Sequence, residues 1–320
     1  MKNILVVGSA GQIGSELTLA LRDIYGGGHV VAGVRKTRPS EKLVETGPCE
    51  VVDALDTDAL VSVVDKYKID GIINMAAILS GTGEKNPMLA WDVNMNGLIN
   101  ILELARERRM KQVLVPSSIA VFGPTTPVDN TPQETILKPT TIYGVTKVAG
   151  ELLGDYYVKK YGLDVRGLRY PGIISHETLP GGGTTDYAVA IYYDAIRQKR
   201  FTCFVDDYTR LPMMYMPDCL KATIDLMGAD FDKLSHHCDY NVGAMDFTVA
   251  DMVVSIKKHI PDFEITYEPD YRQEIADSWP NSVDDSAARQ DWGWKPDYDL
   301  DAMTADMLKA IGEKHEKSLI

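Results

Sequence analysis

Short apolar runs alternate with amphipathic stretches through the first 170 residues of the chain. Runs such as 4–7 (ILVV) and 112–118 (QVLVPSS) have the length of buried strands. The stretches between the runs repeat apolar residues every three or four positions, which predicts helices with one buried face. The expected strands are 4–7, 29–34, 49–54, 71–77, 112–118 and 164–170, and the expected helices are 14–25, 57–67, 87–108 and 143–161. Because strands and helices alternate, we predict an α/β fold with a doubly wound parallel sheet.

This alternation ends after residue 170. Residues 171–188 (PGIISHETLPGGGTTDYA) are rich in Gly, Pro and Thr, shorter mixed elements follow, and a last helix is expected near 301–313. We therefore predict a large α/β domain at residues 1–172 and a smaller lobe at 173–320, with segments of the two interleaved.

Composition favours a protein of the cytoplasm. Hydrophobic residues make up 45% and charged residues 25% of the 320 positions, which is ordinary for a globular protein. No apolar run reaches the roughly 20 residues that span a bilayer, and no signal or transit segment precedes the first strand. The four cysteines form no CxxC pair and the six histidines show no helical ligand spacing, so we expect reduced thiols and no metal site.

The net charge of the chain limits which kinds of binding partner we expect. The formal net charge of −13 disfavours nucleic acid, whose phosphates need basic surfaces. Residues 181–320 hold 14 Lys and Arg but 26 Asp and Glu, so the smaller lobe is a poor site for a large polyanionic substrate. A small-molecule substrate fits the charge better.

The segment VVGSAGQIG at residues 6–14 carries the clearest ligand signal. Gly8, Gly11 and Gly14 follow the first strand and open a helix. Gly8 permits a tight turn, Gly11 lets the backbone approach a pyrophosphate, and Gly14 lets helix and strand pack closely. Since the helix N-terminus offers unpaired N–H groups to phosphates, the segment predicts a dinucleotide site of the Rossmann type in residues 1–172.

The end of the second strand leaves the choice between NAD and NADP open. An acidic residue there would bind the ribose 2′-hydroxyl of NAD. The sequence reads AGVRKT, with Gly33 in the expected place and Arg35 and Lys36 after it, so NAD is expected but NADP is not excluded. Asp53 ends the third strand, where it would meet the adenine. Further expected cofactor contacts are Gln12, Ile13, Arg35, Ala54, Leu55, Met75, Ala76, Ala77, Tyr170, Pro171 and Ile173.

TIYGVTK at residues 141–147 suggests acid–base chemistry. Tyr143 and Lys147 are four positions apart, so both would face the same side of a helix. A neighbouring ammonium favours the phenolate, and we expect the pKa of Tyr143 to fall toward neutrality. A second pair with this spacing, Tyr156 and Lys160, shows that the spacing alone is weak evidence.

The motifs together resemble the extended short-chain dehydrogenase/reductase superfamily. The glycine turn, NMAA at 74–77, PSSIAVFG at 116–123 and YGVTK at 143–147 occur in the same order. The resemblance implies that a Ser, a Tyr and a Lys perform the chemistry, here Ser118, Tyr143 and Lys147, with Ser117 as the alternative hydroxyl. It also places Asn94 at the cofactor site.

Longer strings resemble the short-chain type of L-threonine 3-dehydrogenases. They include AAILSGTGEKNP at 76–87, PGGGTTDYA at 180–188 and ITYEPDYRQEIADSWP at 265–280. This resemblance implies oxidation of L-threonine by NAD to 2-amino-3-ketobutyrate. The implied substrate contacts are Ser80, Ser118, Tyr143, Gly183, Thr184, Thr185 and Trp279. Backbone N–H groups and hydroxyls of PGGGTT would suit a carboxylate.

Two other functions on the same fold stay open. A nucleotide-sugar epimerase or dehydratase would need basic residues such as Arg210 in the acidic lobe to hold a diphosphate. A dinucleotide-sensing regulator without activity would not need the Ser–Tyr–Lys set.

In the superfamily the helices at 87–108 and 143–161 pair across a two-fold axis into a four-helix bundle. Since these helices carry Trp91, Leu98 and Leu152, a homodimer is expected.

Overall fold

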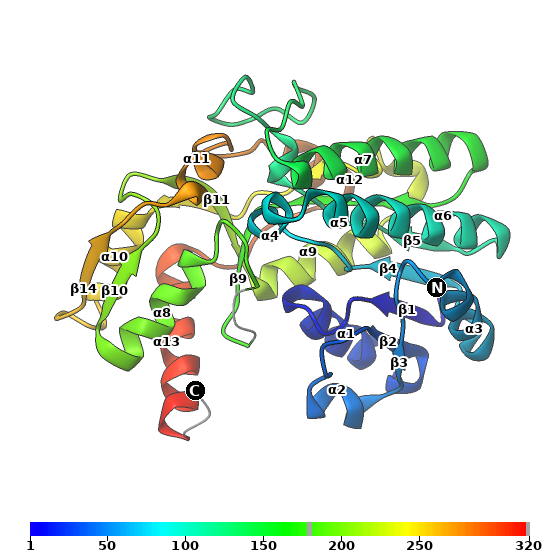
Figure 1. The fold of residues 1–320 in the computed structure, drawn as a ribbon, viewed down its shortest axis with the longest axis horizontal. Coiled ribbons are helices and arrows are strands. Elements are labelled where there is room, and N and C mark those ends of the chain that lie inside the picture. The colour runs from blue at the N-terminus through cyan, green and yellow to red at the C-terminus, as the bar shows by residue number, and fades with distance from the viewer. Residues whose placement is uncertain (178–180, 318–320) are drawn as a thin grey trace.

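A six-stranded parallel sheet forms the centre of the larger part of the molecule, seen at the right of Figure 1. This computed structural model describes residues 1–177 and 181–317. The strand order is β3-β2-β1-β4-β5-β7, the doubly wound order with its reversal between β1 and β4. The strands are β1 (Ile4–Val7), β2 (Val30–Val34), β3 (Cys49–Val51), β4 (Gly71–Asn74), β5 (Gln112–Leu114) and β7 (Val165–Arg166). The predicted fold class is confirmed.

Alternate residues of each strand bury opposite faces of this sheet. Leu5 and Val7 of β1 join the core beneath α3, α6 and α7, whereas Ile4 and Val6 join the core beneath α1 and α9. The helices of this part are α1 (Gln12–Tyr25), α2 (Glu41–Thr46), α3 (Thr57–Tyr67), α4 (Ser80–Lys85), α5 (Pro87–Trp91), α6 (Gly97–Glu107) and α7 (Ile142–Tyr161). Short 3-10 turns, η1 (Gly27–His29) and η3 (Ile119–Val121), complete it.

The helix expected at 87–108 contains a π-helical segment. Between α5 and α6 the chain widens into η2 (Asp92–Asn96), which includes Asn94. Such π segments within α-helices are rare and frequently lie at functional sites.

Two expected strands are each divided. The chain of 112–118 forms β5 and then β6 (Ser117–Ser118), and that of 164–170 forms β7 and then β8 (Leu168–Tyr170). The break in the second is at Gly167, whose backbone N–H donates to His237 O (2.7 Å) and where a Cβ would lie 2.5 Å from Val115 O. β6 and β8 then join β12 (Tyr240–Asn241) in a separate parallel sheet, which turns the two serines away from the large sheet.

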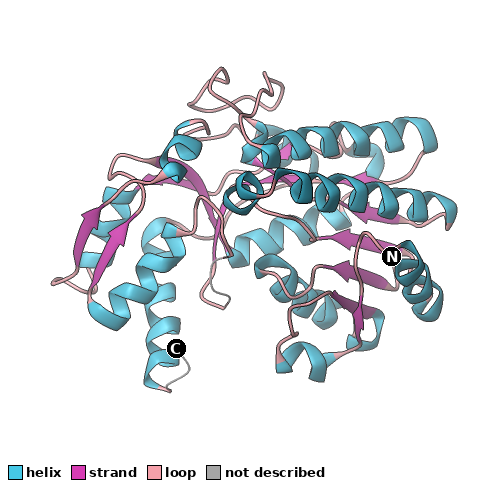
Figure 2. Ribbon diagram, in the orientation of Figure 1, coloured by secondary structure: helices cyan, strands magenta, loops and turns pink. Residues whose placement is uncertain are grey.

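The smaller part lies beside the carboxyl ends of the large sheet (Figures 1 and 2). It holds a sheet of β9 (Gly172–Ile174), β11 (Arg210–Tyr215) and β13 (Met245–Thr248), and a pair of β10 (Arg200–Cys203) with β14 (Glu264–Tyr267). Its helices are α8 (Tyr187–Gln198), α10 (Val249–Lys257), α11 (Tyr271–Asp277) and α13 (Leu300–Glu316). Helix α12 (Ser286–Trp292) and the turn η4 (Phe231–Lys233) instead lie against the larger part (Figure 1), where α12 packs on β12 and the Arg166 guanidinium of β7 lies over the Phe231 ring. The expected last helix is confirmed as α13.

The chain beyond residue 172 also returns to the larger part. Helix α9 (Met216–Gly228) packs against α1, and its Met227 joins the core beneath that helix. The boundary at residue 172 stays a prediction, although this packing agrees with interleaved segments. Among the described helices, none combines the length and the apolar character needed to cross a membrane.

Candidate active site

The glycine turn between β1 and α1 is closed by the backbone itself. The N–H groups of Gly8 and Ser9 both donate to Gly33 O, at 2.9 and 3.0 Å, and Gly8 has a φ of 88°. A Cβ on Gly14 would lie 2.3 Å from Gly8 O, so only glycine lets α1 begin there. No side chain caps the helix at Gly11, which leaves its first N–H groups directed at the cleft. These features fit a pyrophosphate.

The adenosine end of the cleft lies where β1, β2 and β3 end. It encloses about 240 Å³. The expected residues that line it are Gly8, Gly11, Arg35, Lys36, Asp53, Ala54, Met75, Ala76 and Ala77, and the sequence missed Ala10, Thr37, Ile78 and Val93. Leu55 does not line it, because the chain turns there and the Leu55 N–H donates to Asp53 Oδ1 (3.0 Å).

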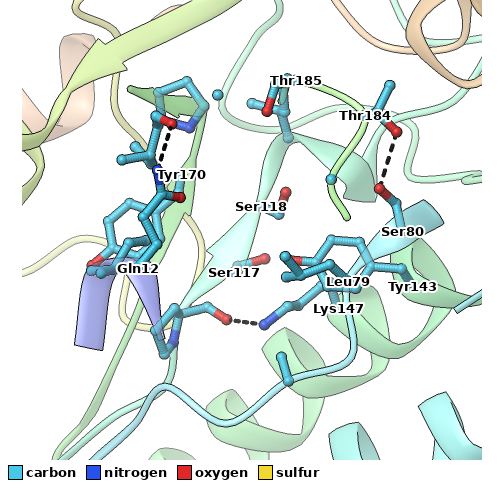
Figure 3. Close-up of a pocket in the computed structure, with 18 of the residues that line it drawn as sticks. Gln12, Leu79, Ser80, Ser117, Ser118, Tyr143, Lys147, Tyr170, Thr184 and Thr185 are labelled. Atoms are coloured by element: carbon cyan, nitrogen blue, oxygen red, sulfur yellow. Dashed lines mark hydrogen bonds between the residues drawn. The ribbon is translucent and has the colours of Figure 1, made fainter. Parts of the chain in front are cut away.

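The opposite end of the cleft, also of about 240 Å³, brings the expected catalytic side chains together (Figure 3). Tyr143 and Lys147 lie on the buried face of α7. Thr141 caps the N-terminus of this helix, because its hydroxyl accepts a hydrogen bond from Gly144 N (3.0 Å). Tyr143 and Ser118 both line the cleft, and the Ser118 hydroxyl is near enough to lower the pKa of Tyr143. The other expected residues found at this end are Gly11, Gln12, Ile13, Gly14, Met75, Ala77, Ser117, Tyr170, Pro171 and Ile173.

The electrostatics of Tyr143 differ from the expectation. Burial raises the pKa of Tyr143 to about 12, and the hydrogen bond from Ser118 lowers it only in part. Burial also lowers the pKa of Lys147 to about 8. The Lys147 ammonium lies 5.5 Å from the Tyr143 ring centroid and donates to Pro116 O (2.7 Å). The prediction that the pKa of Tyr143 falls toward neutrality is therefore wrong for the protein's own groups, since desolvation raises it and Lys147 is not among the groups that shift it.

Ser117 faces the opposite way from Ser118. Its hydroxyl donates to Glu151 Oε1 (2.5 Å), and the same carboxylate receives Nε and Nη2 of Arg169 at 2.9 and 2.8 Å. Glu151 and Arg169 are both buried. The sequence analysis missed this pair, although Glu151 follows Lys147 by four positions and so shares its helix face.

Asn94 holds the backbone beside the cleft. Its Oδ1 accepts from Ile78 N (2.8 Å), and its Nδ2 donates to Ile78 O and to Thr146 Oγ1, both at 3.1 Å. Asn94 does not line either large end of the cleft. The described contacts make it a positioning residue for the segment that leads to Ser80.

The substrate side of the cleft is formed by two loops and a tryptophan. Ser80 Oγ and Thr184 Oγ1 are 3.1 Å apart, and Gly183, Thr185 and the largely buried Trp279 line the same space. The N–H groups of Gly182 and Gly183 each donate to Asp186 Oδ2 (2.8 Å). The expectation that these N–H groups are available to a carboxylate is wrong, because Asp186 already occupies them. Pro180, which begins PGGGTT, lies outside the described residues.

Several residues at this end were not singled out from the sequence. They are Asn74, Leu79, Pro116, Ile119, Gly172 and Asp186. Most are apolar or belong to strand ends, and only the folded chain brings them to one place. The second Tyr–Lys pair does not line the cleft, and Tyr156 is half exposed on α7.

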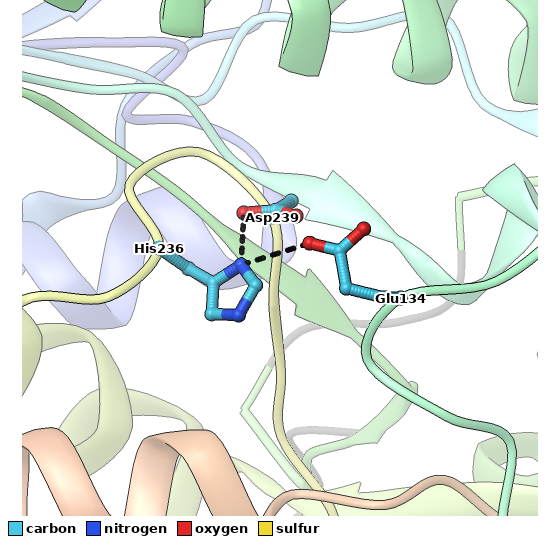
Figure 4. Close-up of side chains that lie close together, drawn as sticks. All are labelled: Glu134, His236 and Asp239. Atoms are coloured by element: carbon cyan, nitrogen blue, oxygen red, sulfur yellow. Dashed lines mark ion pairs between the residues drawn. The ribbon is translucent and has the colours of Figure 1, made fainter.

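A histidine between two carboxylates lies outside this cleft (Figure 4). His236 Nδ1 is 3.4 Å from Asp239 Oδ1 and 3.6 Å from Glu134 Oε1. The hydrogen bond to Asp239 raises the pKa of His236. Arg169 Nη2 is 3.6 Å from Asp239, so this cluster continues the buried ion pair of Glu151 and Arg169.

The strand order, the glycine turn and the Tyr–Lys helix define an enzyme of the extended short-chain dehydrogenase/reductase class. The chain belongs to the NAD dependent epimerase/dehydratase family, because the sequence profile of that family matches residues 4–243. Two relatives align with nearly the whole chain. A protein of Staphylococcus haemolyticus is 50% identical over 317 residues, 99% of each chain, and one of Staphylococcus aureus is 48% identical over 315 residues, 98% of each. Both carry the description uncharacterized epimerase/dehydratase.

Solved structures of L-threonine dehydrogenases are similar along almost the entire chain. That of Clostridium difficile is 50% identical, covers 98% of both chains and has a TM-score of 0.95. That of Phytophthora infestans is 49% identical, covers 98% of this chain and 99% of its own, and has a TM-score of 0.93. The resemblance drawn from the sequence is confirmed, and the chain is an enzyme that uses a nicotinamide dinucleotide.

Proposed function

We propose that the protein oxidises the C3 hydroxyl of L-threonine to give 2-amino-3-ketobutyrate and a reduced nicotinamide dinucleotide. The observation that carries this proposal is that the Tyr143 and Ser118 side chains line the same end of a small cleft, with Ser118 near enough to lower the pKa of Tyr143. The cleft is walled by hydroxyl groups and an indole, which suits a small polar alcohol. The similar structures of L-threonine dehydrogenases support the choice of substrate.

The bound oxidised nicotinamide would supply a hydride acceptor, and this chain's residues would handle the proton. Tyr143 Oη accepts the proton of the substrate hydroxyl as general base. Ser118 Oγ donates a hydrogen bond to the same substrate oxygen while it becomes a carbonyl oxygen. Both roles require the two hydroxyls to face the cleft from different elements, α7 and β6, as they do.

Ionising Tyr143 requires positive charge near it, because burial alone raises its pKa to about 12. Lys147 uses one of its three N–H donors on Pro116 O and keeps two for other partners. When protonated, it stabilises the phenolate from beside the ring. The positive charge of an oxidised nicotinamide in this water-poor cleft would act in the same direction.

On the substrate side, Ser80, Thr184 and Thr185 offer hydroxyl groups and Trp279 closes the space. We assign the zwitterionic end of threonine to these hydroxyls. Backbone N–H groups of Gly182 and Gly183 play no part in this assignment, since they are bound to Asp186.

The direct test is the appearance of reduced cofactor, followed by its near-ultraviolet absorbance, when the purified protein is given L-threonine. Tyr143→Phe should lower kcat about 10²–10⁴-fold, the usual contribution of a positioned acid–base group, and should leave cofactor affinity unchanged. Tyr156→Phe, on the exposed side of the same helix, is the matched control and should keep full activity. Turnover of another alcohol but not of threonine would refute the substrate assignment.

The nucleotide-sugar alternative finds little support in the cleft. Lys147 is the one Lys or Arg among the described residues that line the catalytic end. Arg210, the residue considered for a diphosphate, instead pairs with Asp246 Oδ1 (3.3 Å) and is half exposed. A UDP-glucose 4-epimerase of Thermotoga maritima is 20% identical with a TM-score of 0.83, a likeness of fold only. A Tyr143→Phe variant that still binds cofactor but loses all turnover would rule out the non-catalytic regulator.

We also propose a homodimer formed by α5, α6 and α7. Apolar side chains are exposed along these helices, among them Met88 (72%), Leu152 (65%) and Trp91 (38%), whereas Leu98 is buried in the core. A similar dehydrogenase from a metagenome is described as monomeric, so the state must be measured. Light scattering should give about twice 35.4 kDa, and Leu152→Glu should reduce the mass to that of one chain. A monomeric mass for the unchanged protein would refute the dimer.

We place the protein in the cytoplasm on the basis of its cysteines. All four are free, and three of them are buried. Fractionation of the source cells would test this location.

A further inference from the structure

The loop that follows β2 is basic although the chain is acidic. Residues 33–42 contain four Lys or Arg and one Glu, in a protein whose net charge is −13. Two of these basic residues, Arg35 and Lys36, line the adenosine end of the cleft together with Thr37. A positive patch is thus placed beside the position of the adenosine ribose.

The acid that would select NAD is missing from β2. Gly33 has no side chain, and Val34 is 6% exposed at the strand end. Among the described residues that line the adenosine end, Asp53 is the one acid. It comes from β3, and its two oxygens accept from Leu55 N and Arg35 Nη1. No carboxylate at the end of β2 is therefore present to receive a ribose 2′-hydroxyl.

The basic side chains are available to an anion. The Arg35–Asp53 pair spans 3.5 Å, with the two side chains 42% and 35% exposed. Such exposed pairs contribute little stability, so the guanidinium can turn to a phosphate at small cost. Lys36 is exposed and makes no ion pair within the described part of the chain.

We propose that Arg35, Lys36 and the Thr37 hydroxyl form a subsite for the 2′-phosphate of NADP, and that this enzyme prefers NADP to NAD. Guanidinium and ammonium groups form charge-assisted hydrogen bonds with phosphate. An unphosphorylated ribose would leave these donors without an anionic partner. The inference rests on the proposed function only for the existence of the dinucleotide site, and it departs from the sequence expectation of NAD.

The test compares two fragments of the cofactor by calorimetry on the full-length protein. 2′,5′-ADP and 5′-AMP differ only in the 2′-phosphate. We expect 2′,5′-ADP to bind about 10- to 100-fold more tightly at low ionic strength, the range for hydrogen bonds to charged groups. The preference should shrink as salt is added, because the charges are exposed. Equal affinities, tighter binding of 5′-AMP, or no binding of 2′,5′-ADP would overturn the inference.

The double variant Arg35→Ala, Lys36→Ala should remove the preference, so that its affinities for 2′,5′-ADP and 5′-AMP lie within about twofold of each other. Arg38→Ala is the matched control: it belongs to the same loop, is exposed and does not line the cleft. If Arg38→Ala reduced the preference equally, diffuse charge would explain it and the subsite would be refuted. Circular dichroism verifies that the variants fold.

The kinetic readout separates this inference from the proposed function. With L-threonine, the ratio of kcat/KM for NADP to that for NAD should exceed one and fall below one in the double variant. If threonine is inert with both cofactors while 2′,5′-ADP still binds selectively, the substrate assignment fails and the subsite stands. If threonine is oxidised with NAD and 2′,5′-ADP shows no advantage, the subsite fails and the dehydrogenase stands.

Discussion

Ser117 and Ser118 are adjacent in the chain, yet their hydroxyls serve different parts of the molecule. β6 is an extended segment, so successive side chains point to opposite sides. Ser118 is near enough to Tyr143 to lower its pKa, and Ser117 donates to the buried Glu151. The two residues carry the same hydroxyl group, and their different partners are the reason that Ser118 is the proposed catalytic hydroxyl.

Ser118→Ala should lower kcat about 10²-fold, because the substrate oxygen loses a donor that strengthens as the carbonyl forms. Ser117→Ala is the matched variant. It should lower the free energy of unfolding by about 1–3 kcal/mol, the cost of a buried hydrogen bond left unmade, and change kcat much less. Steady-state kinetics and urea unfolding of both variants check this. The reverse pattern would assign the catalytic hydroxyl to Ser117.

Breaking the ion pair of Glu151 and Arg169 should strongly lower the free energy of unfolding. Their side chains are 5% and 3% exposed, so Glu151→Ala would leave a buried guanidinium without its main anion. We expect a loss of about 3–5 kcal/mol in the free energy of unfolding. Asp262→Ala, which breaks the exposed pair with Lys199, should lower the free energy of unfolding far less, because solvent screens this pair. Equal losses in the two variants would contradict the argument.

At the scale of elements, the turn between β1 and α1 depends on the closeness of two backbone segments. Gly14, in the first turn of α1, lies against Gly8 O, and Gly8 lies against the end of β4, where a Cβ would be 2.7 Å from Ala76 N. The two glycines thus bring the helix N-terminus and the strand ends to the same point. This point is where the cofactor phosphates would meet free N–H groups.

Gly14→Ala should therefore abolish detectable cofactor binding, because a Cβ 2.3 Å from Gly8 O forces α1 away from the turn. Gly228→Ala, at the end of α9, has no heavy atom within 4 Å of the added Cβ and should bind cofactor normally. Titration of the intrinsic tryptophan fluorescence with NADPH measures both. Normal affinity in Gly14→Ala would show that the turn can shift to make room.

At the scale of the whole molecule, the two parts meet through hydrogen bonds that join α1 to β9 and to Ser175, the residue that follows β9. Gln12 Nε2 donates to Ile173 O (3.4 Å), and Ser175 Oγ donates to Glu16 Oε1 (2.6 Å). Burial raises the pKa of Glu16 to about 7, and the charge of Glu177 adds to the rise while Lys314 opposes it. The contact between the parts therefore contains a carboxyl group that titrates near neutrality.

This shift predicts a pH-dependent effect of Glu16→Gln. The folded protein holds the Glu16 proton more tightly than the unfolded chain, whose pKa is near 4.5. The stability that Glu16 contributes is thus full below about 4.5 and is lost as pH rises through about 7. Glu16→Gln should stabilise the protein at pH 8 relative to pH 5 by up to about 3 kcal/mol. Urea unfolding at the two pH values measures this, and an identical effect at both would contradict the raised pKa.

The order of strands and helices could be predicted from the sequence. The strands of a parallel sheet are buried on both faces, and they therefore appear as short continuous apolar runs. The glycine turn and the Tyr–Lys helix could be located for the same reason: their spacing is local. The serine pair was identified through the resemblance to the superfamily. The division around Gly167 could not be predicted, since this break is made by contacts with His237 and Val115 from distant segments. The sequence also does not show that the N–H groups of Gly182 and Gly183 bind Asp186 or that the N–H group of Leu55 binds Asp53, because these contacts depend on how the loops fold.

The sequence by itself determined the doubly wound class and the dinucleotide turn, since each follows from periodicity or spacing within a few turns of chain, whereas the candidate Ser, Tyr and Lys were identified through a resemblance to a known superfamily. Only the tertiary structure decided that Ser117 binds Glu151, that Asn94 supports backbone, and that Glu151 pairs with Arg169. It also decided the sign of the Tyr143 pKa shift. Spacing reveals the nearest charge, but the free energy of an ionised phenol depends on how much water all its neighbours exclude.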